Sequence, residues 1–205
     1  MAGWALAFLA LFGLLGVGLR AFVQYRRTGS TGVRGVSGEP GSAEWAGGVL
    51  FMLAWALLAL GALLDAWDAL GPVGLLDTDG ARAAGVGLFV AGLATTLVAQ
   101  YAMGDSWRIG VGEDESTDLV TEGVFGAVRN PIYTGMIPSF AGIVLLVPNP
   151  VSLAALGVLV AGVEIQTRIV EEPHLMKVHG GAYATYAARV GRFVPGVGRI
   201  RRRAD

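Results

Sequence analysis

The sequence predicts an all-α, polytopic membrane protein with five transmembrane helices, and two observations carry this prediction. Hydrophobic residues make up 54% of the 205 residues and charged residues only 15%, whereas soluble domains carry roughly 25% charged residues. Several uninterrupted apolar runs are also long enough to cross a bilayer as helices. The 32 glycines fit this class, because small residues let membrane helices approach closely.

The first predicted span covers residues 3–23. It is too long for a typical signal peptide, no basic region precedes it, and basic residues follow it. A polar loop rich in glycine and serine, residues 24–44, leads to the second span, residues 45–64. The third span, residues 81–103, follows a loop that contains aspartates and no lysine or arginine.

The last two spans, residues 131–147 and 151–169, form a predicted helical hairpin. Asn130 can cap the first of them, with Pro131 at its first helical position. Pro148 and Pro150 favour a tight turn between the two spans. Within the second of them, Gly157 and Ala161 have a spacing typical of packed membrane helices.

Lysine and arginine are distributed unevenly along the chain. Of the 15, only Arg82 falls beside a loop or end that the five spans would place outside. Cytoplasmic loops carry the lysine and arginine excess, so we expect the N-terminus outside and the C-terminus in the cytoplasm. The chain then divides into residues 1–103, with three spans and the loop 24–44, and residues 104–205, with the hairpin 131–169 and a cytoplasmic tail.

Charge gathers where the fifth span ends. Glu164, Arg168, Glu171 and Glu172 would share one helix face if the helix continued to the following proline. Two interpretations stay open: a salt-bridged helix end at the membrane interface, or a site for a charged ligand at the cytoplasmic edge. The hairpin favours the second, because it would bring Arg129 to the same depth as the glutamates.

Other polar and aromatic side chains near this edge have two interpretations as well. Tyr133 and Tyr186 are either interfacial anchors or parts of the same site. Gln100 is an unusual polar group near the cytoplasmic end of an apolar run. No metal site is expected, because the chain has no cysteine and His174 and His179 are five residues apart. The net charge of −1 gives no indication of nucleic-acid binding.

Several short motifs in the last half of the chain resemble those of one enzyme family. In order they are Leu119 to Phe125, Arg129-Asn130-Pro131-Ile132-Tyr133-Thr134-Gly135, Glu171-Glu172-Pro173-His174-Leu175, Gly180-Gly181-Ala182-Tyr183-Ala184-Thr185-Tyr186, and Val190-Gly191-Arg192-Phe193-Val194-Pro195. Their order and spacing resemble the isoprenylcysteine carboxyl methyltransferases, a family that is itself similar to the phospholipid N-methyltransferases.

The resemblance implies S-adenosylmethionine as methyl donor, in a cytoplasmic pocket built from loop 104–129 and the C-terminal tail. It implies a lipophilic acceptor that enters from the bilayer: an isoprenylcysteine-like carboxylate, or another small hydrophobic carboxylate, thiol or amine. O-methyl transfer is the expected reaction. The resemblance leaves the oligomeric state open.

The resemblance also implies roles for individual residues. The catalytic residues would be Arg129, Tyr133 and Glu172. The cofactor would contact Gln100, Leu119, Val120, Gly123, Asn130, Tyr133, Glu171 and Glu172. The acceptor would contact Arg168, Tyr186, Arg192 and Phe193. Asn130 departs from the family pattern, which has histidine there, and an asparagine cannot shuttle a proton.

Two other classes of membrane protein are alternatives. A membrane reductase of the sterol-reductase type would use a nicotinamide cofactor and need basic groups for its phosphates. The adjacent pair Glu171 and Glu172 argues against a polyphosphate at this place. A non-catalytic membrane protein, such as a small transporter, would be expected to hold polar groups at the bilayer midplane, whereas the cluster here lies at the edge.

Overall fold

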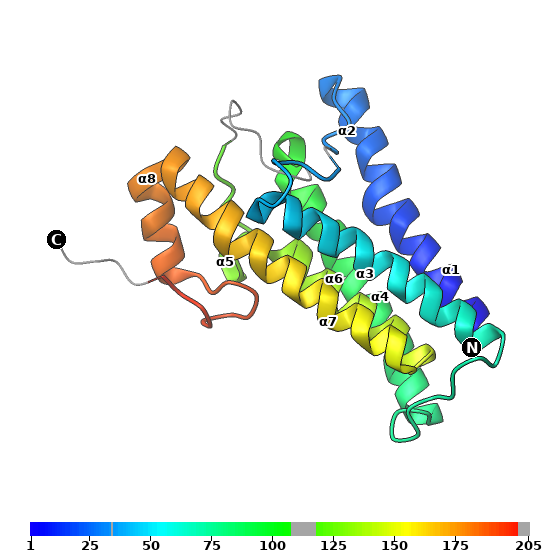
Figure 1. Cartoon of the computed structure of the whole chain (residues 1–205). Helices are drawn as coiled ribbons and strands as arrows, with labels where there is room; N and C mark the ends of the chain where they lie inside the picture. The colour runs from blue at the N-terminus through cyan, green and yellow to red at the C-terminus, as the bar shows by residue number, and fades with distance from the viewer. Residues whose placement is uncertain (34, 108–117, 201–205) are drawn as a thin grey trace.

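All regular secondary structure in the described residues is helical (Figure 1). The computed structural model describes residues 1–33, 35–107 and 118–200. The elements are α1 (Ala2–Phe12), η1 (Gly13–Leu19), α2 (Arg20–Thr28), α3 (Ala43–Ala66), α4 (Asp79–Met103), η2 (Gly104–Ser106), α5 (Val124–Ala127), α6 (Pro131–Leu146), α7 (Pro150–Ile165), η3 (Gln166–Glu171) and α8 (Glu172–Arg189).

The helices confirm a multi-pass membrane protein. Among the residues that the structure describes, four stretches are long and apolar enough to cross a membrane: Ala2–Thr28, Ala43–Ala66, Asp79–Met103 and Pro150–Arg189. Helix α6 is apolar but shorter, at 16 residues, so the count of five spans stays a prediction. The N-terminus and the α6–α7 turn lie at one end of the molecule, and α5 and α8 lie at the other (Figure 1).

Local sequence explains three of the helix starts in the described chain. The side chains of Ser42, Thr78 and Asn149 each accept a hydrogen bond from a backbone N–H of the first turn of α3, α4 and α7. Such caps satisfy N–H groups that the helix itself leaves unpaired. The predicted side-chain cap at Asn130 is wrong: this side chain makes no capping bond to α6, and its amide donates to the Arg192 carbonyl instead.

Two helices are longer than predicted. Residues 24–28, expected in a loop, continue the first helix, and the predicted polar tail begins as α8. The π-helical turn η3 precedes Pro173 and widens the backbone where the proline ring would crowd the preceding turn. Gly180 then breaks the helical geometry with φ +50°, a value that glycine adopts at little cost.

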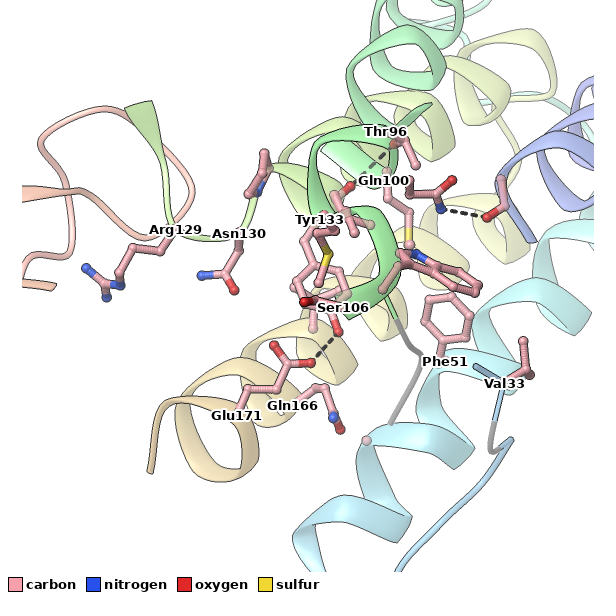
Figure 2. A pocket seen from close by; sticks show the side chains of 18 of the residues that line it. Val33, Phe51, Thr96, Gln100, Ser106, Arg129, Asn130, Tyr133, Gln166 and Glu171 are labelled. Atoms are coloured by element: carbon pink, nitrogen blue, oxygen red, sulfur yellow. Dashed lines mark hydrogen bonds between the residues drawn. The ribbon is translucent and has the colours of Figure 1, made fainter. Parts of the chain in front are cut away.

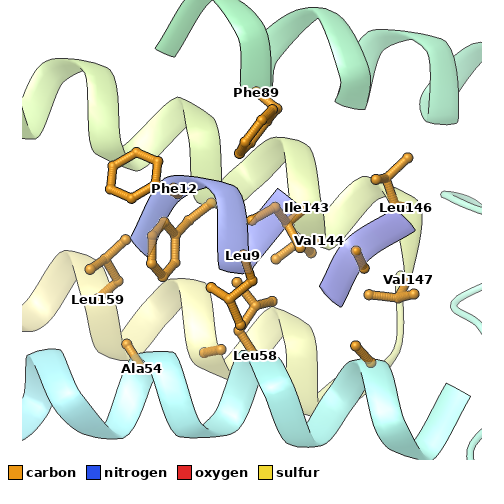
Figure 3. Close-up of a cluster of buried hydrophobic side chains, with 14 of the residues drawn as sticks. Leu9, Phe12, Ala54, Leu58, Phe89, Ile143, Val144, Leu146, Val147 and Leu159 are labelled. Atoms are coloured by element: carbon orange, nitrogen blue, oxygen red, sulfur yellow. The ribbon is translucent and has the colours of Figure 1, made fainter. Parts of the chain in front are cut away.

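The spans pack as two close pairs, α4 with α6 and α3 with α7. Glycines let the first pair touch backbone to backbone: a Cβ added at Gly135 would lie 2.5 Å from the Gly92 carbonyl oxygen. The helix contact predicted at Gly157 is not made in the described chain, since no atom lies within 4 Å of a Cβ placed there. Large side chains such as Phe12, Leu58 and Phe89 fill the core between the helices (Figure 3).

Candidate functional site

The chain after α8 returns to the start of α6. The Arg129 N–H donates to the Gly191 carbonyl (2.8 Å) and the Asn130 N–H to the Arg192 carbonyl (3.0 Å). The Asn130 side-chain amide donates to the same Arg192 carbonyl (3.2 Å). Two motifs that lie about 60 residues apart in sequence are therefore joined directly, and Asn130 needs only a hydrogen-bond donor for this role.

Glu172 is the centre of a buried ion network. Its carboxylate accepts from Arg129 Nη2 at 2.6 Å, and from Arg192 Nε and Nη2, each at 2.8 Å. The Glu172 side chain is 9% exposed and that of Arg129 2%. The hydrogen bond to Glu172 raises the pKa of the Arg192 guanidinium above its usual value, so Arg192 stays charged. Both carboxylate oxygens of Glu172 are thus occupied by protein groups.

Arg129 is hydrogen-bonded to the backbone of the C-terminal segment, residues 187–198. Its Nη1 donates to the carbonyls of Val190 (2.5 Å) and Ala187 (3.2 Å), and its Nη2 also donates to the Gly198 carbonyl (3.1 Å). Its guanidinium extends away from Tyr133 and Glu171 (Figure 2). Only Nε has no partner in the described part of the chain. Arg129 therefore holds the backbone around the site with most of its donors.

Glu171 points to a different neighbourhood from Glu172. The Tyr133 hydroxyl donates to Glu171 Oε1 at 2.8 Å, and both side chains line a cavity (Figure 2). Consecutive helical residues point about 100° apart, so two adjacent glutamates serve two environments: Glu172 lies in the ion network and Glu171 at the cavity.

The cavity has a volume of about 520 Å³ and two unlike parts. The polar part is lined by Glu44, Asp118, Arg129, Asn130, Tyr133, Glu171, His174, Tyr183 and Tyr186, together with Leu119, Val120 and Leu175. The apolar part lies between η1, α3 and α4 and is lined by Phe12, Val17, Phe51, Met52 and Trp55. The cavity thus connects the motif-bearing end of the molecule to the interior of the helix bundle.

Several predicted site residues lie elsewhere or have structural partners. Arg168 is exposed and pairs with Glu164 one turn earlier, and it does not line the cavity. Arg192 and Phe193 are also absent from the lining, and Phe193 packs against the hydrophobic core. Tyr186 lines the cavity, and its hydroxyl donates to the Phe125 carbonyl (2.7 Å). Gly123 borders a second hollow, which Leu119 and Val120 share.

Two groups of lining residues were not predicted. The aromatic residues Phe12, Phe51 and Trp55 come from the first two spans, where no sequence signal distinguishes them from core side chains. The acidic residue Glu44 lies in the first turn of α3, and Asp118 directly follows the segment outside the described residues. A charge beside an apolar helix is a weak signal, because most such charges simply face solvent.

Comparisons with known proteins agree with the resemblance in the sequence. Residues 81–182, about half of the chain, match the family model for phospholipid methyltransferases. Over 87 residues the chain is 34% identical to protein-S-isoprenylcysteine O-methyltransferase B of Arabidopsis thaliana. The aligned region covers 42% of this chain and 44% of that protein. The chain therefore spans less than half the length of this relative.

Proposed function

Since residues 81–182 belong to the phospholipid methyltransferase family, we propose that this chain is an integral membrane methyltransferase that uses S-adenosylmethionine and methylates a lipophilic acceptor. One observation carries the proposal: a single cavity has an acidic, polar end at the family motifs and an apolar end among the membrane helices. Such a cavity suits a water-soluble cationic donor at one end and a lipid-like acceptor at the other.

The polar end fits S-adenosylmethionine in charge and in polarity. Its acidic side chains, Glu44, Asp118 and Glu171, would attract the sulfonium and ammonium groups of the donor. Leu119 and Val120 offer apolar contacts for an adenine ring.

A nicotinamide cofactor fits less well. Its phosphates would need free cations, yet Arg129 is the only lysine or arginine among the described lining residues. Three of its hydrogen bonds go to backbone carbonyls and one to Glu172. Arg192 is likewise paired with Glu172. This arrangement disfavours the reductase alternative.

The residues of the polar end would act by alignment. The bound donor supplies an electrophilic methyl group, which is transferred by in-line displacement and therefore depends mainly on orientation. Tyr133 fixes the Glu171 carboxylate by a hydrogen bond, so Glu171 would hold the donor in one pose. Glu172, Arg129 and Arg192 would act as positioning residues, because their charges are satisfied by one another and by the backbone.

The apolar end would receive the acceptor from the bilayer. Its aromatic and aliphatic lining suits a hydrocarbon chain. A carboxylate acceptor is ionised at pH 7 and needs no general base, whereas an amine or thiol would first have to lose a proton. A lipophilic carboxylate, isoprenylcysteine-like in character, is therefore the proposed acceptor, because its methylation needs no general base in the cavity. The reaction would then be O-methylation.

The proposed topology follows from the same arrangement. The polar end, α8 and the arginine-rich C-terminus would face the cytoplasm, and the N-terminus would lie outside, with α6 as the fifth crossing. Residues 1–103 would form most of the membrane-facing wall of the cavity, and residues 104–205 most of its polar end.

Calorimetric titration with S-adenosylhomocysteine tests the proposal in the detergent-purified chain. We expect micromolar binding that weakens at least about tenfold in Glu171→Gln, since a charge-assisted hydrogen bond is lost. The matched control is Glu164→Gln, because Glu164 forms an exposed pair with Arg168 away from the cavity. That variant should bind like the unmodified chain.

Either of two results would overturn the proposal. The first is binding of NADPH, titrated in parallel, without binding of S-adenosylhomocysteine by the folded protein. The second is the absence of both, which would leave the cavity without a methyl donor. Equal affinity in Glu171→Gln and the unmodified chain would refute the role of Glu171 alone.

A further inference from the structure

We propose that Glu44 and Gln166 form the subsite for the amino-acid end of S-adenosylmethionine, where Glu44 takes the ammonium group and Gln166 the carboxylate. The inference rests on the proposed function and extends the donor site to the N-terminal half of the chain. Neither residue belongs to the family motifs, and Glu44 lies outside residues 81–182, the region that matches the family.

Glu44 presents a free carboxylate oxygen at the cavity. It lies in the first turn of α3, and its side chain lines the cavity together with that of Ser37. The Ser37 hydroxyl donates to Glu44 Oε1 at 2.5 Å, and the carboxylate has no other partner among the described residues. This bond orients the carboxylate and leaves Oε2 to accept a hydrogen bond from a ligand.

Gln166 presents an amide at the same cavity. It is the first residue of η3 and lines the cavity beside Glu171 (Figure 2). Within the described chain its amide makes no hydrogen bond, and both of its polar atoms keep accessible surface. Gln100 on α4 differs, because its amide donates to the Gly16 carbonyl at 2.6 Å and its oxygen is buried. A ligand can therefore bond to Gln166, whereas Gln100 is part of the packed wall.

A glycine brings these two side chains together. A Cβ added at Gly47 would lie 2.9 Å from Gln166 Oε1, so this amide lies directly against α3. Glu44 precedes Gly47 by one turn on the same helix face, and Cβ atoms at this spacing are about 5–6 Å apart. Because the Gln166 oxygen faces the α3 backbone, the amide N–H group remains for a ligand. A carboxylate and an amide donor thus border the same stretch of the cavity.

The two groups together suit the zwitterion of an amino acid. The Glu44 carboxylate would accept a charge-assisted hydrogen bond from the ammonium group, and the Gln166 amide would donate one to the carboxylate. A lipophilic carboxylate acceptor fits less well, because Glu44 would repel its charge and the acceptor brings no cation to offset this repulsion. The polar pair therefore favours the donor over the acceptor as its ligand.

The position of the pair also suits the length of the donor. Gln166, Glu171 and Leu175 line the cavity in succession, and the helical rise places the first and last roughly 10–14 Å apart along the axis. Leu175 and Leu119 pack against the same tyrosine cluster, which is the end proposed for adenine. The donor would thus lie along η3 and the start of α8, with its nucleoside near Leu175 and its amino acid near α3.

The experiment compares S-adenosylhomocysteine with methylthioadenosine, which keeps the nucleoside and the sulfur but has a methyl group in place of the amino-acid chain. Both are titrated calorimetrically into the full detergent-purified chain. We expect the unmodified chain to bind S-adenosylhomocysteine at least about tenfold more tightly, as charge-assisted hydrogen bonds allow. Glu44→Gln should weaken S-adenosylhomocysteine about tenfold and Gln166→Leu about fivefold. Neither variant should change the affinity for methylthioadenosine, whose binding also shows that the variant is folded.

A third ligand separates the two roles: the analogue of S-adenosylhomocysteine in which hydrogen replaces the ammonium group. Glu44→Gln should not weaken this analogue, because the contact in question is already absent, whereas Gln166→Leu should weaken it.

Two further variants complete the design. Glu39→Gln makes the same chemical change at an exposed glutamate of the same loop that does not line the described cavity, and it should bind every ligand like the unmodified chain. Ser37→Ala removes the hydrogen bond that orients Glu44, so it should weaken S-adenosylhomocysteine about two- to fivefold. This variant tests the subsite independently should Glu44→Gln fail to fold.

The subsite is rejected if the unmodified chain binds S-adenosylhomocysteine and methylthioadenosine equally, or if Glu44→Gln and Gln166→Leu weaken both ligands alike, as a purely structural role would. Unchanged affinity for S-adenosylhomocysteine in both folded variants rejects it as well. In each of these cases the proposed function stands, because the donor product still binds to the unmodified chain. Absence of S-adenosylhomocysteine binding by the folded chain would instead overturn the proposed function and the subsite together.

Discussion

Glu172→Ala is expected to lower the free energy of unfolding by about 3–5 kcal/mol, because it leaves the buried Arg129 and the partly buried Arg192 without their carboxylate. The Glu172 side chain is 9% exposed and bonds to both guanidinium groups, so water can replace little of what is lost. For a chain of this size the unfolding midpoint should fall by about 6–20 °C. Thermal unfolding of the detergent-purified variant, followed by circular dichroism, measures the effect.

The control for this prediction is Glu164→Ala. Glu164 also pairs with an arginine, Arg168, but that side chain is 55% exposed, and exposed pairs one helical turn apart contribute only about 0.3–0.5 kcal/mol. If both variants unfolded at the same temperature, the ion network around Glu172 would not hold the C-terminal segment as described.

Gly135→Ala should have the second large effect, a destabilisation of about 1–3 kcal/mol through overpacking. The added Cβ would lie 2.5 Å from the Gly92 carbonyl oxygen and 2.6 Å from Thr96 Oγ1. The upper end of the range is expected, because a backbone oxygen cannot move aside without separating α4 from α6. The unfolding midpoint measures this loss, and donor binding should weaken with it, since Tyr133 lies on the same helix.

The same substitution at Gly157 is the matched control. A Cβ there meets no atom within 4 Å in the described chain, and alanine is a better helix former than glycine by roughly 0.5–1 kcal/mol. Gly157→Ala should therefore unfold at the same temperature as the unmodified chain or slightly above it. A similar loss in both variants would mean that glycine content, and not the close approach at Gly135, sets the stability.

The glycine contacts show what the sequence could not decide. A small-residue spacing marks a helix face that is able to pack, and many faces of this chain have it. Gly157 has the pattern and no neighbour, whereas Gly92 and Gly135 meet because α4 and α6 lie side by side. Which helices become neighbours depends on the whole bundle, and spacing within one helix carries no information on it.

The two glutamates show the same limit at the candidate site. Their motif places them side by side in the sequence, and the family resemblance implies that both contact the cofactor. In the structure Glu171 bonds to Tyr133 at the cavity, whereas Glu172 bonds to two arginines. The two side chains point in different directions because consecutive helical residues are about 100° apart. Their partners differ because the C-terminal segment returns to bring Arg192 to Glu172, and local sequence does not encode this return.

The sequence alone determined the class of molecule, because apolar length and composition directly measure the cost of exposing a segment to water or to lipid. The caps at Ser42, Thr78 and Asn149 are contacts within four residues, but the one cap that we predicted from the sequence, at Asn130, is not made, because the Asn130 amide bonds to the distant Arg192 carbonyl. The tertiary structure alone decided which polar groups bond to other parts of the protein and which line the cavity. Glu172 pairs with Arg129, 43 residues earlier, and with Arg192, 20 residues later, and Gln100 bonds to Gly16 on another helix. Such long-range pairings exist only once the helices have packed.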